Sequence, residues 1–263
     1  MTKKYAKPEE FTTLELMAVC GSKQIKNGEV VFIGTGLPLI AAMLAKKTHA
    51  PGAKIVYEAG FIDSNAKDIA LSIADSRLGY HAAGAIGLIE TLGLMLQGGH
   101  VDLGFVGAAQ IDEYGNINTT YIGSFEKPVV RLPGSGGGND IISSAKRVVA
   151  IMTHEKRKMV KKLDYLTSPG FLDGPGARER TGLLGGGPSL VVTNLCQMDF
   201  DPKTKRIRLA TVHPGVSVQQ VVENSGFELI IPQNVPTTEL PTYEELELLK
   251  AIDPKGIYIP RSK

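Results

Sequence analysis

The chain has 263 residues, 43% of them hydrophobic, so it can bury a substantial core as one large or two small domains. Its 29 Lys and Arg residues nearly balance its 27 Asp and Glu residues, and a net charge of +2 gives no reason to expect a nucleic-acid partner. The two cysteines lie far apart in sequence and belong to no disulfide framework or metal-binding pattern, so we expect no metal site. No signal peptide and no apolar run long enough to span a membrane is recognised, which predicts a cytoplasmic protein without membrane contact.

The first third of the chain predicts a β-α-β unit. Residues 12–15 have the spacing of a capping box and predict a first helix that ends near Gly28. A strand over 29–33, a glycine turn at 34–36 and an apolar, buried helix ending at Lys47 follow. A second strand over 54–57 completes the unit, which favours a parallel sheet.

Later segments extend the same pattern. Further strands are predicted over 102–106, 129–132, 147–152 and 189–193, and these mostly apolar strands alternate with helices. They predict an α/β fold with an open, mostly parallel sheet flanked by helices, as a single domain over 1–263. Residues 196–212 predict a small antiparallel hairpin at one sheet edge, and short helices are expected over 217–224 and 243–251.

A glycine-rich loop is the most informative motif. Four glycines surround Ser135 between Gly134 and Asp140, and glycines leave successive backbone N–H groups uncovered. Such composition is also typical of a mobile linker, but this loop lies between two predicted strands rather than between domains. We therefore interpret it as a loop that holds an anion.

Glu58 is the second informative feature, because it ends an apolar strand and is followed by Ala59 and Gly60. A carboxylate at the tip of a buried strand is costly to keep, although an isolated acid there commonly caps a turn or pairs with a base. Glu58 also follows the 34–36 turn at about the 20-residue interval of a dinucleotide-binding acid. Leu39 stands where the third glycine of that motif belongs and Pro38 removes an N–H, so a nucleotide-binding module is only an alternative.

Other polar groups are interpreted as structural. Residues 112–118 are expected to shape a turn beside the site. Arg178 and Arg180 are candidates for binding a carboxylate, although a role in holding Glu179 and the Pro-Gly turns in place is slightly favoured. The charged run from His154 to Lys158 is expected to be a solvated helix start or a subunit contact.

Four motifs occur in a fixed order, at 58–60, 107–118, 134–140 and 168–180. Together they resemble the β subunit of family I CoA-transferases, and among these the glutaconate enzymes, over nearly the whole chain. The resemblance implies that Glu58 attacks an acyl-CoA thioester and then carries CoA as a glutamyl thioester. It also implies that the glycine loop stabilises the oxyanion that each attack creates.

The resemblance assigns further roles by position. Gly137 and Gly138 are the expected oxyanion donors, and the residues expected to bind substrate are Gly34, Gly36, Ala59, Gly60, Phe61, Gln110, Gly134, Gly136 and Asn139. No cofactor is implied besides coenzyme A as a co-substrate. The implied partners are an α subunit, in an assembly of two α and two β chains or larger, an acyl-CoA and a carboxylic acid.

Two sequence features bear on the alternatives within this fold. Ala59 replaces the serine or asparagine of related β subunits and Phe61 follows, which predicts a more apolar wall beside the site. Relatives that decarboxylate lack the glutamate, so Glu58 argues against decarboxylation. A CoA-thioester hydrolase or ring-opening hydrolase with Glu58 as a base is the remaining alternative.

Overall fold

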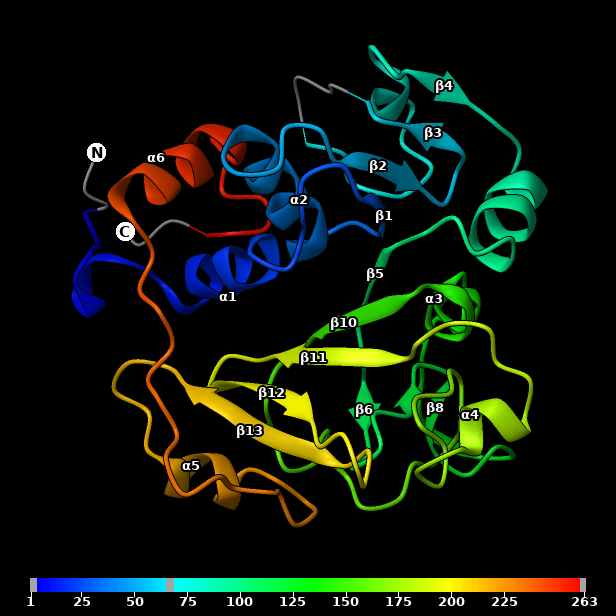
Figure 1. Cartoon of the computed structure of the whole chain (residues 1–263), viewed down its shortest axis with the longest axis vertical. Coiled ribbons are helices and arrows are strands. Elements are labelled where there is room, and N and C mark those ends of the chain that lie inside the picture. Colours follow the sequence, from blue (N-terminus) through cyan, green and yellow to red (C-terminus); the bar gives the residue numbers. More distant parts are fainter. Residues whose placement is uncertain (1–3, 65–68, 261–263) are drawn as a thin grey trace. The chain divides into compact units, whose positions relative to one another are not determined.

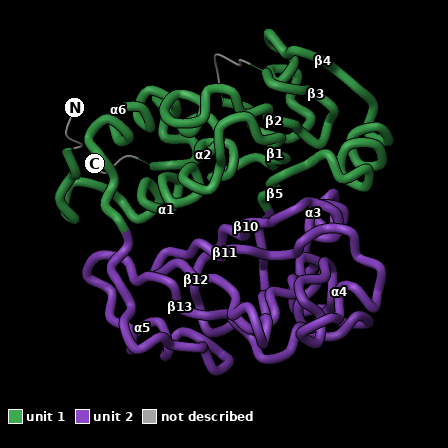
Figure 2. Tube along the Cα trace, viewed as in Figure 1, with its two compact units in different colours: residues 1–105, 239–263 green, residues 106–238 purple. Residues whose placement is uncertain are grey.

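The computed structural model describes residues 4–64 and 69–260, and it shows mixed sheets flanked by helices (Figure 1). The chain divides into two compact units, residues 1–105 with 239–263 and residues 106–238 (Figure 2). The core strands of each unit are parallel and antiparallel strands follow them, which confirms the predicted α/β class. A single domain over 1–263 stays a prediction.

The described residues contain six α-helices, two 3₁₀ helices and one π-helix. The helices are η1 (Pro8–Glu10), α1 (Thr13–Ser22), α2 (Leu37–Lys47), η2 (Ser76–Gly79), the π-helix η3 (Glu90–Gln97), α3 (Gly138–Ser144), α4 (Ala177–Arg180), α5 (Val218–Glu223) and α6 (Tyr243–Ile252). The strands are β1 (Val30–Ile33), β2 (Lys54–Tyr57), β3 (Phe61–Ile62), β4 (Gly84–Ala85), β5 (Leu103–Val106), β6 (Gln110–Ile111), β7 (Ile117–Asn118), β8 (Tyr121–Gly123), β9 (Pro128–Arg131), β10 (Arg147–Ile151), β11 (Pro188–Val192), β12 (Cys196–Phe200) and β13 (Ile207–Val212).

The first unit contains the predicted β-α-β unit. Its strands run in the order β5-β1-β2-β3-β4, with β1 parallel to both β5 and β2 and with β3 and β4 antiparallel at the edge. Helices α1 and α2 pack on each other, and α6 packs on α2 (Figure 1). Most of α2 is buried, as its run of apolar residues predicts.

The first helix is shorter than predicted. Thr12 and Glu15 form the expected capping box, but α1 ends at Ser22 instead of near Gly28. The N–H groups of Gln24 and Ile25 instead bond to carbonyls three residues earlier, in tight turns. Ile25 is thereby buried outside the helix, so its apolar character does not mark the helix length.

The second unit contains the predicted hairpin. Its strands run in the order β13-β12-β11-β10, with β10 parallel to β11 and the pair β12–β13 antiparallel at the end of the row (Figure 1). The outer side of β13 makes further single bridges from Arg208 to Ile230 and from Val212 to Thr237. The hairpin and its position at a sheet edge are confirmed.

The predicted strand over 129–132 forms, but not where it was expected. It is β9, which pairs only with β8 in a two-stranded ribbon, and the side chains of Val129 and Val130 are 80% and 45% exposed. Apolar β-branched residues favour extended backbone without determining what covers it. The glycine loop therefore does not join two covered strands, and it leads directly into α3, which was not predicted.

Candidate active site

A tight turn holds Glu58 at the end of β2. The turn is closed by a 2.8 Å hydrogen bond from the N–H of Gly60 to the carbonyl of Tyr57, and the Glu58 side chain is half-buried. Gly60 has a φ of +95°, and its own carbonyl accepts a 3.0 Å bond from the N–H of Ile86. A Cβ at position 60 would lie 1.8 Å from the carbonyl oxygen of Ile86, so only glycine fits behind the carboxylate.

The register of the sheet brings the 34–36 turn beside Glu58. Strands β1 and β2 are parallel with Ile33 opposite Tyr57, so the two turns leave the sheet side by side at its carboxyl edge. Gly36 has a φ of +86° and is the N-cap of α2. Ligands in open α/β folds bind at this edge of the sheet. The register therefore agrees with the prediction that Gly34 and Gly36 lie near Glu58.

The residues after Glu58 lie in the turn and in β3. Ala59 is half-buried within the turn. Phe61 pairs with Ala85 of β4, and its Cε1 atom lies 3.0 Å from the position that a Cβ on Gly79 would occupy. The Phe61 ring therefore packs closely on η2, and its predicted contact with substrate stays a prediction.

The glycine loop belongs to the second unit and presents two backbone donors. The N–H groups of Gly136 and Gly137 have no hydrogen-bond partner among residues 4–64 and 69–260, and Gly137 is buried. The N–H of Gly138 instead donates to the carbonyl of Ser135 at 2.9 Å. Of the two predicted donors, Gly138 therefore already has a hydrogen-bond partner, and binding of an oxyanion by the N–H of Gly137 stays a prediction.

The predicted site residues divide between the two units. Glu58 and the glycines beside it belong to the first unit, whereas Gln110 and the loop residues Gly134, Gly136, Gly137, Gly138 and Asn139 belong to the second. Each half is ordered by its own contacts. Sequence reasoning missed Ile86, which fixes the Glu58 turn, and Thr119 and Thr167, which bind the glycine loop, because no local pattern marks them.

Comparison with known proteins shows the family of this chain. Residues 14–224 match the model of the family described as Coenzyme A transferase. The chain belongs to the coenzyme A transferase family. It is 42% identical over 243 residues to the B subunit of 3-oxoadipate CoA-transferase of Pseudomonas knackmussii, covering 92% of this chain and 94% of that protein. It is also 42% identical over 255 residues to the B subunit of glutaconate CoA-transferase of Acidaminococcus fermentans, covering 95% of each.

A solved structure agrees with these relatives. The crystal structure of glutaconate coenzyme A-transferase from Acidaminococcus fermentans superposes with a TM-score of 0.90 at 40% identity, covering 96% of this chain and 99% of that chain. The enzyme class predicted from the sequence, a CoA-transferase, is confirmed. The hydrolase and nucleotide-binding alternatives are not favoured.

In this transferase chain Gln110 is part of a hydrogen-bond network. Its Oε1 accepts bonds from Asn118 Nδ2 at 2.8 Å and from the N–H of Asp164 at 3.2 Å, and its Nε2 donates to Asp164 Oδ2 at 3.0 Å. The residue is 4% exposed. These bonds order the chain behind the glycine loop, and direct substrate contact by Gln110 stays a prediction.

The motifs at 107–118 and 168–180 pack on each other. Asn116 Oδ1 accepts bonds from the N–H groups of Gly170 and Leu172, while its Nδ2 donates to Asp112 and to the carbonyl of Leu172. Asp112 Oδ1 accepts the N–H of Tyr114 within the turn. The expected turn-shaping role of residues 112–118 is what these bonds perform.

Arg178 is structural, as expected. The buried guanidinium donates to the carbonyls of residues 142, 143, 169, 170 and 185, at 2.8 to 3.1 Å. Burial lowers the pKa of Arg178. All three of its nitrogens are used on backbone, so it joins the end of α3 to the 168–180 motif and leaves no group for a substrate carboxylate.

The expectation for the charged run at 154–158 is wrong at its first residue. His154 is 2% exposed, its Nε2 lies 3.0 Å from Ser225 Oγ, and its Nδ1 lies 3.3 Å from Thr193 Oγ1. Burial lowers the pKa of His154 to about 4. No helix starts here: residues 152–155 have no regular structure, residues 156–158 form a turn, and the His154 side chain is buried.

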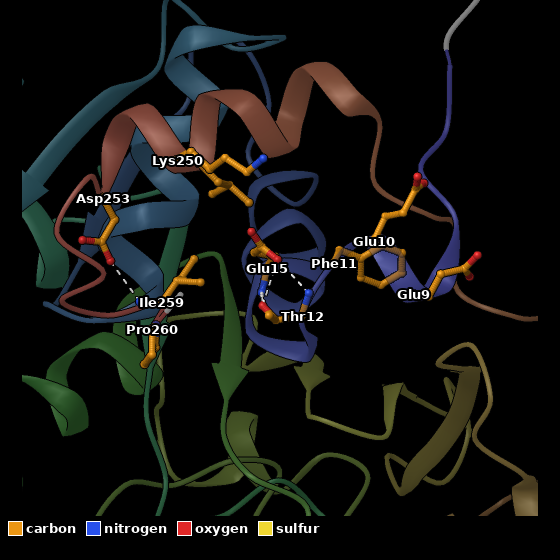
Figure 3. A pocket seen from close by; sticks show the side chains of 10 residues that line it. Glu9, Glu10, Phe11, Thr12, Glu15, Lys250, Asp253, Ile259 and Pro260 are labelled. Carbon is orange, nitrogen blue, oxygen red and sulfur yellow. Dashed lines mark hydrogen bonds between the residues drawn. The ribbon is translucent and has the colours of Figure 1, made fainter. Parts of the chain in front are cut away.

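Two cavities of the first unit are lined by none of the predicted site residues. One of about 310 Å³ is lined by acidic groups near both ends of the chain, including Glu10, Glu15 and Asp253 (Figure 3). Glu15 accepts bonds from Thr12, and Asp253 from three backbone N–H groups, so these carboxylates complete local structure. The other, about 360 Å³, is lined by α2, Tyr57 and residues that follow β3.

Neither a metal centre nor a membrane span is found in the described part of the chain. Over residues 4–64 and 69–260, no three His, Cys, Asp or Glu side chains are grouped so that they could hold a metal ion. Across the same ranges, every helix is too short or too polar to cross a bilayer.

Proposed function

We propose that this chain is the B-type component of a two-subunit CoA-transferase in which Glu58 carries CoA as a glutamyl thioester. The observation that carries the proposal is the position of Glu58 at the carboxyl end of a parallel strand in a chain whose family match spans 14–224. A half-buried carboxylate on a turn that admits only glycine behind it is well suited to attack a carbonyl repeatedly from one position.

The reaction needs no group beyond the substrates and this carboxylate. A Glu58 oxygen attacks the thioester carbonyl of the donor, forming an acyl-glutamyl anhydride and releasing CoA thiolate. The thiolate attacks the glutamyl carbonyl of the anhydride, which frees the donor acid and leaves CoA on Glu58. The carboxylate of an acceptor acid then repeats these steps in reverse, and Glu58 is regenerated.

Each attack places negative charge on a carbonyl oxygen. We assign the stabilisation of that charge to the N–H groups of Gly137 and Gly136, since neither has a partner in the described part of the chain. One such donor typically lowers a barrier by about 3 kcal/mol. Gly138 contributes by forming the turn, through its bond to Ser135.

The partner and substrates follow from the relatives. Both are B subunits by name, so we propose a partner of the complementary type, in an assembly of two copies of each or larger. One relative is named for 3-oxoadipate and the other for glutaconate, which favours a dicarboxylic acid as one substrate. A cytoplasmic location stays a prediction of the sequence.

The test is CoA transfer by the complex of this chain with its partner, measured with a panel of acyl-CoA donors and with glutaconate or 3-oxoadipate as acceptor. Glu58→Ala and Glu58→Gln should lower transfer by roughly 10⁴-fold or more, because the nucleophile is lost. Glu90→Gln, an exposed acid of the same unit, should keep wild-type transfer. Substantial transfer by Glu58→Ala would refute the nucleophile, and CoA release without any acceptor would indicate a hydrolase.

A further inference from the structure

One threonine binds both backbone groups of the first loop glycine. Thr119 Oγ1 donates to the carbonyl of Gly134 at 2.8 Å, and the carbonyl of Thr119 accepts the N–H of Gly134 at 2.9 Å. Gly134 has a φ of +95°, and within the described ranges no atom other than those of its chain neighbours lies within 4 Å of where its Cβ would be. No close contact on that side fixes Gly134, and the two bonds to Thr119 hold it in place.

A second threonine supports both Thr119 and the far end of the loop. Thr167 Oγ1 accepts the N–H of Thr119 at 2.9 Å and lies 2.6 Å from Thr120 Oγ1. The carbonyl of Thr167 accepts a 2.8 Å bond from Asn139 Nδ2. Thr167 is 7% exposed. The loop is therefore bound at Gly134 by Thr119 and at Asn139 by the buried Thr167, and these two threonines are hydrogen-bonded to each other.

The hydrogen-bond network continues to Gln110, which the sequence analysis predicts to bind substrate. Asn118 Oδ1 accepts the N–H of Thr120 at 2.9 Å, and Asn118 Nδ2 donates to Gln110 Oε1 at 2.8 Å. Asn118 is fully buried. Gln110 is thus linked by hydrogen bonds through Asn118 and Thr120 to Thr167, and all of these residues belong to the second unit.

We propose that Thr119 is a positioning residue, which holds the N–H groups of Gly136 and Gly137 in the orientation that binds the oxyanion. This inference rests on the function proposed above. Glycine-rich backbone has many accessible conformations, and donors stabilise developing charge only when they are already oriented before the reaction. The hydroxyl of Thr119 restricts the loop at a glycine whose Cβ side is open.

The test compares three variants in the complex with the partner subunit. Thr119→Val keeps the shape and removes the hydroxyl donor, and Thr119→Ser keeps the donor. Thr181→Val is the matched control, because Thr181 Oγ1 also donates to backbone carbonyls, those of Ala177 at 2.8 Å and Arg178 at 3.1 Å, and to none in the glycine loop. We expect Thr119→Val to lower kcat roughly 10- to 100-fold with KM nearly unchanged, while the other two variants stay near wild type.

Amide hydrogen exchange over residues 134–141 gives a readout that does not depend on the reaction. Exchange should rise in Thr119→Val and stay at the wild-type rate in Thr119→Ser and Thr181→Val. If Thr119→Val matches Thr181→Val in kcat and exchange, or if Thr119→Ser is as impaired as Thr119→Val, the inference is wrong. Failure of Glu58 as nucleophile would appear only in the Glu58 variants, so the exchange data still decide the role of Thr119.

Discussion

The Glu58 turn and the glycine loop each contain a glycine with the same positive φ, in different surroundings. Gly60 and Gly134 both have a φ of +95°, but a Cβ on Gly60 would lie 1.8 Å from the carbonyl oxygen of Ile86, whereas a Cβ on Gly134 would meet nothing within 4 Å. Close packing against Ile86 and two backbone hydrogen bonds hold the first turn, whereas two hydrogen bonds with Thr119 hold the second. The turn that carries the proposed nucleophile therefore has no room for a side chain at its glycine, while the loop that carries the proposed donors depends on hydrogen bonds that a substitution can remove.

The sharpest test of this difference is Gly60→Ala, for which we expect the largest loss of stability. The methyl group must displace backbone as well as adopt a strained φ, so the free energy of unfolding should fall by roughly 3–5 kcal/mol. The matched control is Gly28→Ala, since Gly28 has a φ of +87° with open space around it and should lose about 1 kcal/mol. Urea denaturation of both variants measures the two losses in free energy of unfolding. Equal losses would show that packing does not hold the Glu58 turn.

Replacing Arg178 tests the contacts that join the end of α3 to the 168–180 motif. Arg178→Lys cannot reproduce the planar set of donors, and several buried carbonyls lose their partner, so we expect a loss of roughly 3 kcal/mol. Arg180→Lys is the control, because Arg180 is exposed and pairs with exposed Asp173. Its stability should change by less than about 0.5 kcal/mol. If both variants melt alike, the role of Arg178 is misassigned.

Acid should destabilise the second unit through His154. Its pKa is lowered to about 4 in the folded chain, so the unfolded chain binds the proton first as pH falls below its ordinary value. The contribution of His154 to the free energy of unfolding is therefore fully present above about pH 6.5. It is lost as the pH falls from about 6.5 to about 4, by roughly 3 kcal/mol in total. Urea denaturation across this range should show a shallower pH dependence in His154→Gln, whereas exposed His100→Gln should follow wild type.

Gly134→Ala should have the smallest effect on stability of the four changes, their controls aside. Only the unfavourable φ opposes the methyl group, so the expected loss is about 1 kcal/mol. Because the strain falls on the loop that carries the donors, kcat should fall further than stability alone explains. Thermal melts measure the stability and transfer assays measure kcat. An unchanged kcat would mean that the loop does not need the positive φ at Gly134.

Local sequence patterns predicted those parts of the fold that depend on residues close together in sequence. The β-α-β unit, the hairpin at 196–212 and the position of Glu58 at a strand end all follow from apolar runs, glycines and capping residues. Burial of His154 and exposure of Val129 could not be predicted, because each depends on segments distant in sequence. Thr119 is likewise an ordinary threonine until tertiary structure places Gly134 against it.

The central claim is that Glu58 becomes covalently bound to CoA, and intact-mass spectrometry tests it most directly. The complex with the partner subunit would be incubated with each acyl-CoA and then with sodium borohydride, which reduces a glutamyl thioester to an alcohol. We expect this chain to lose the mass that separates a carboxylate from a primary alcohol, only when acyl-CoA is present, with peptide mapping assigning the change to Glu58. An unchanged mass in a complex that still transfers CoA, or the same change in Glu58→Ala, would contradict the account.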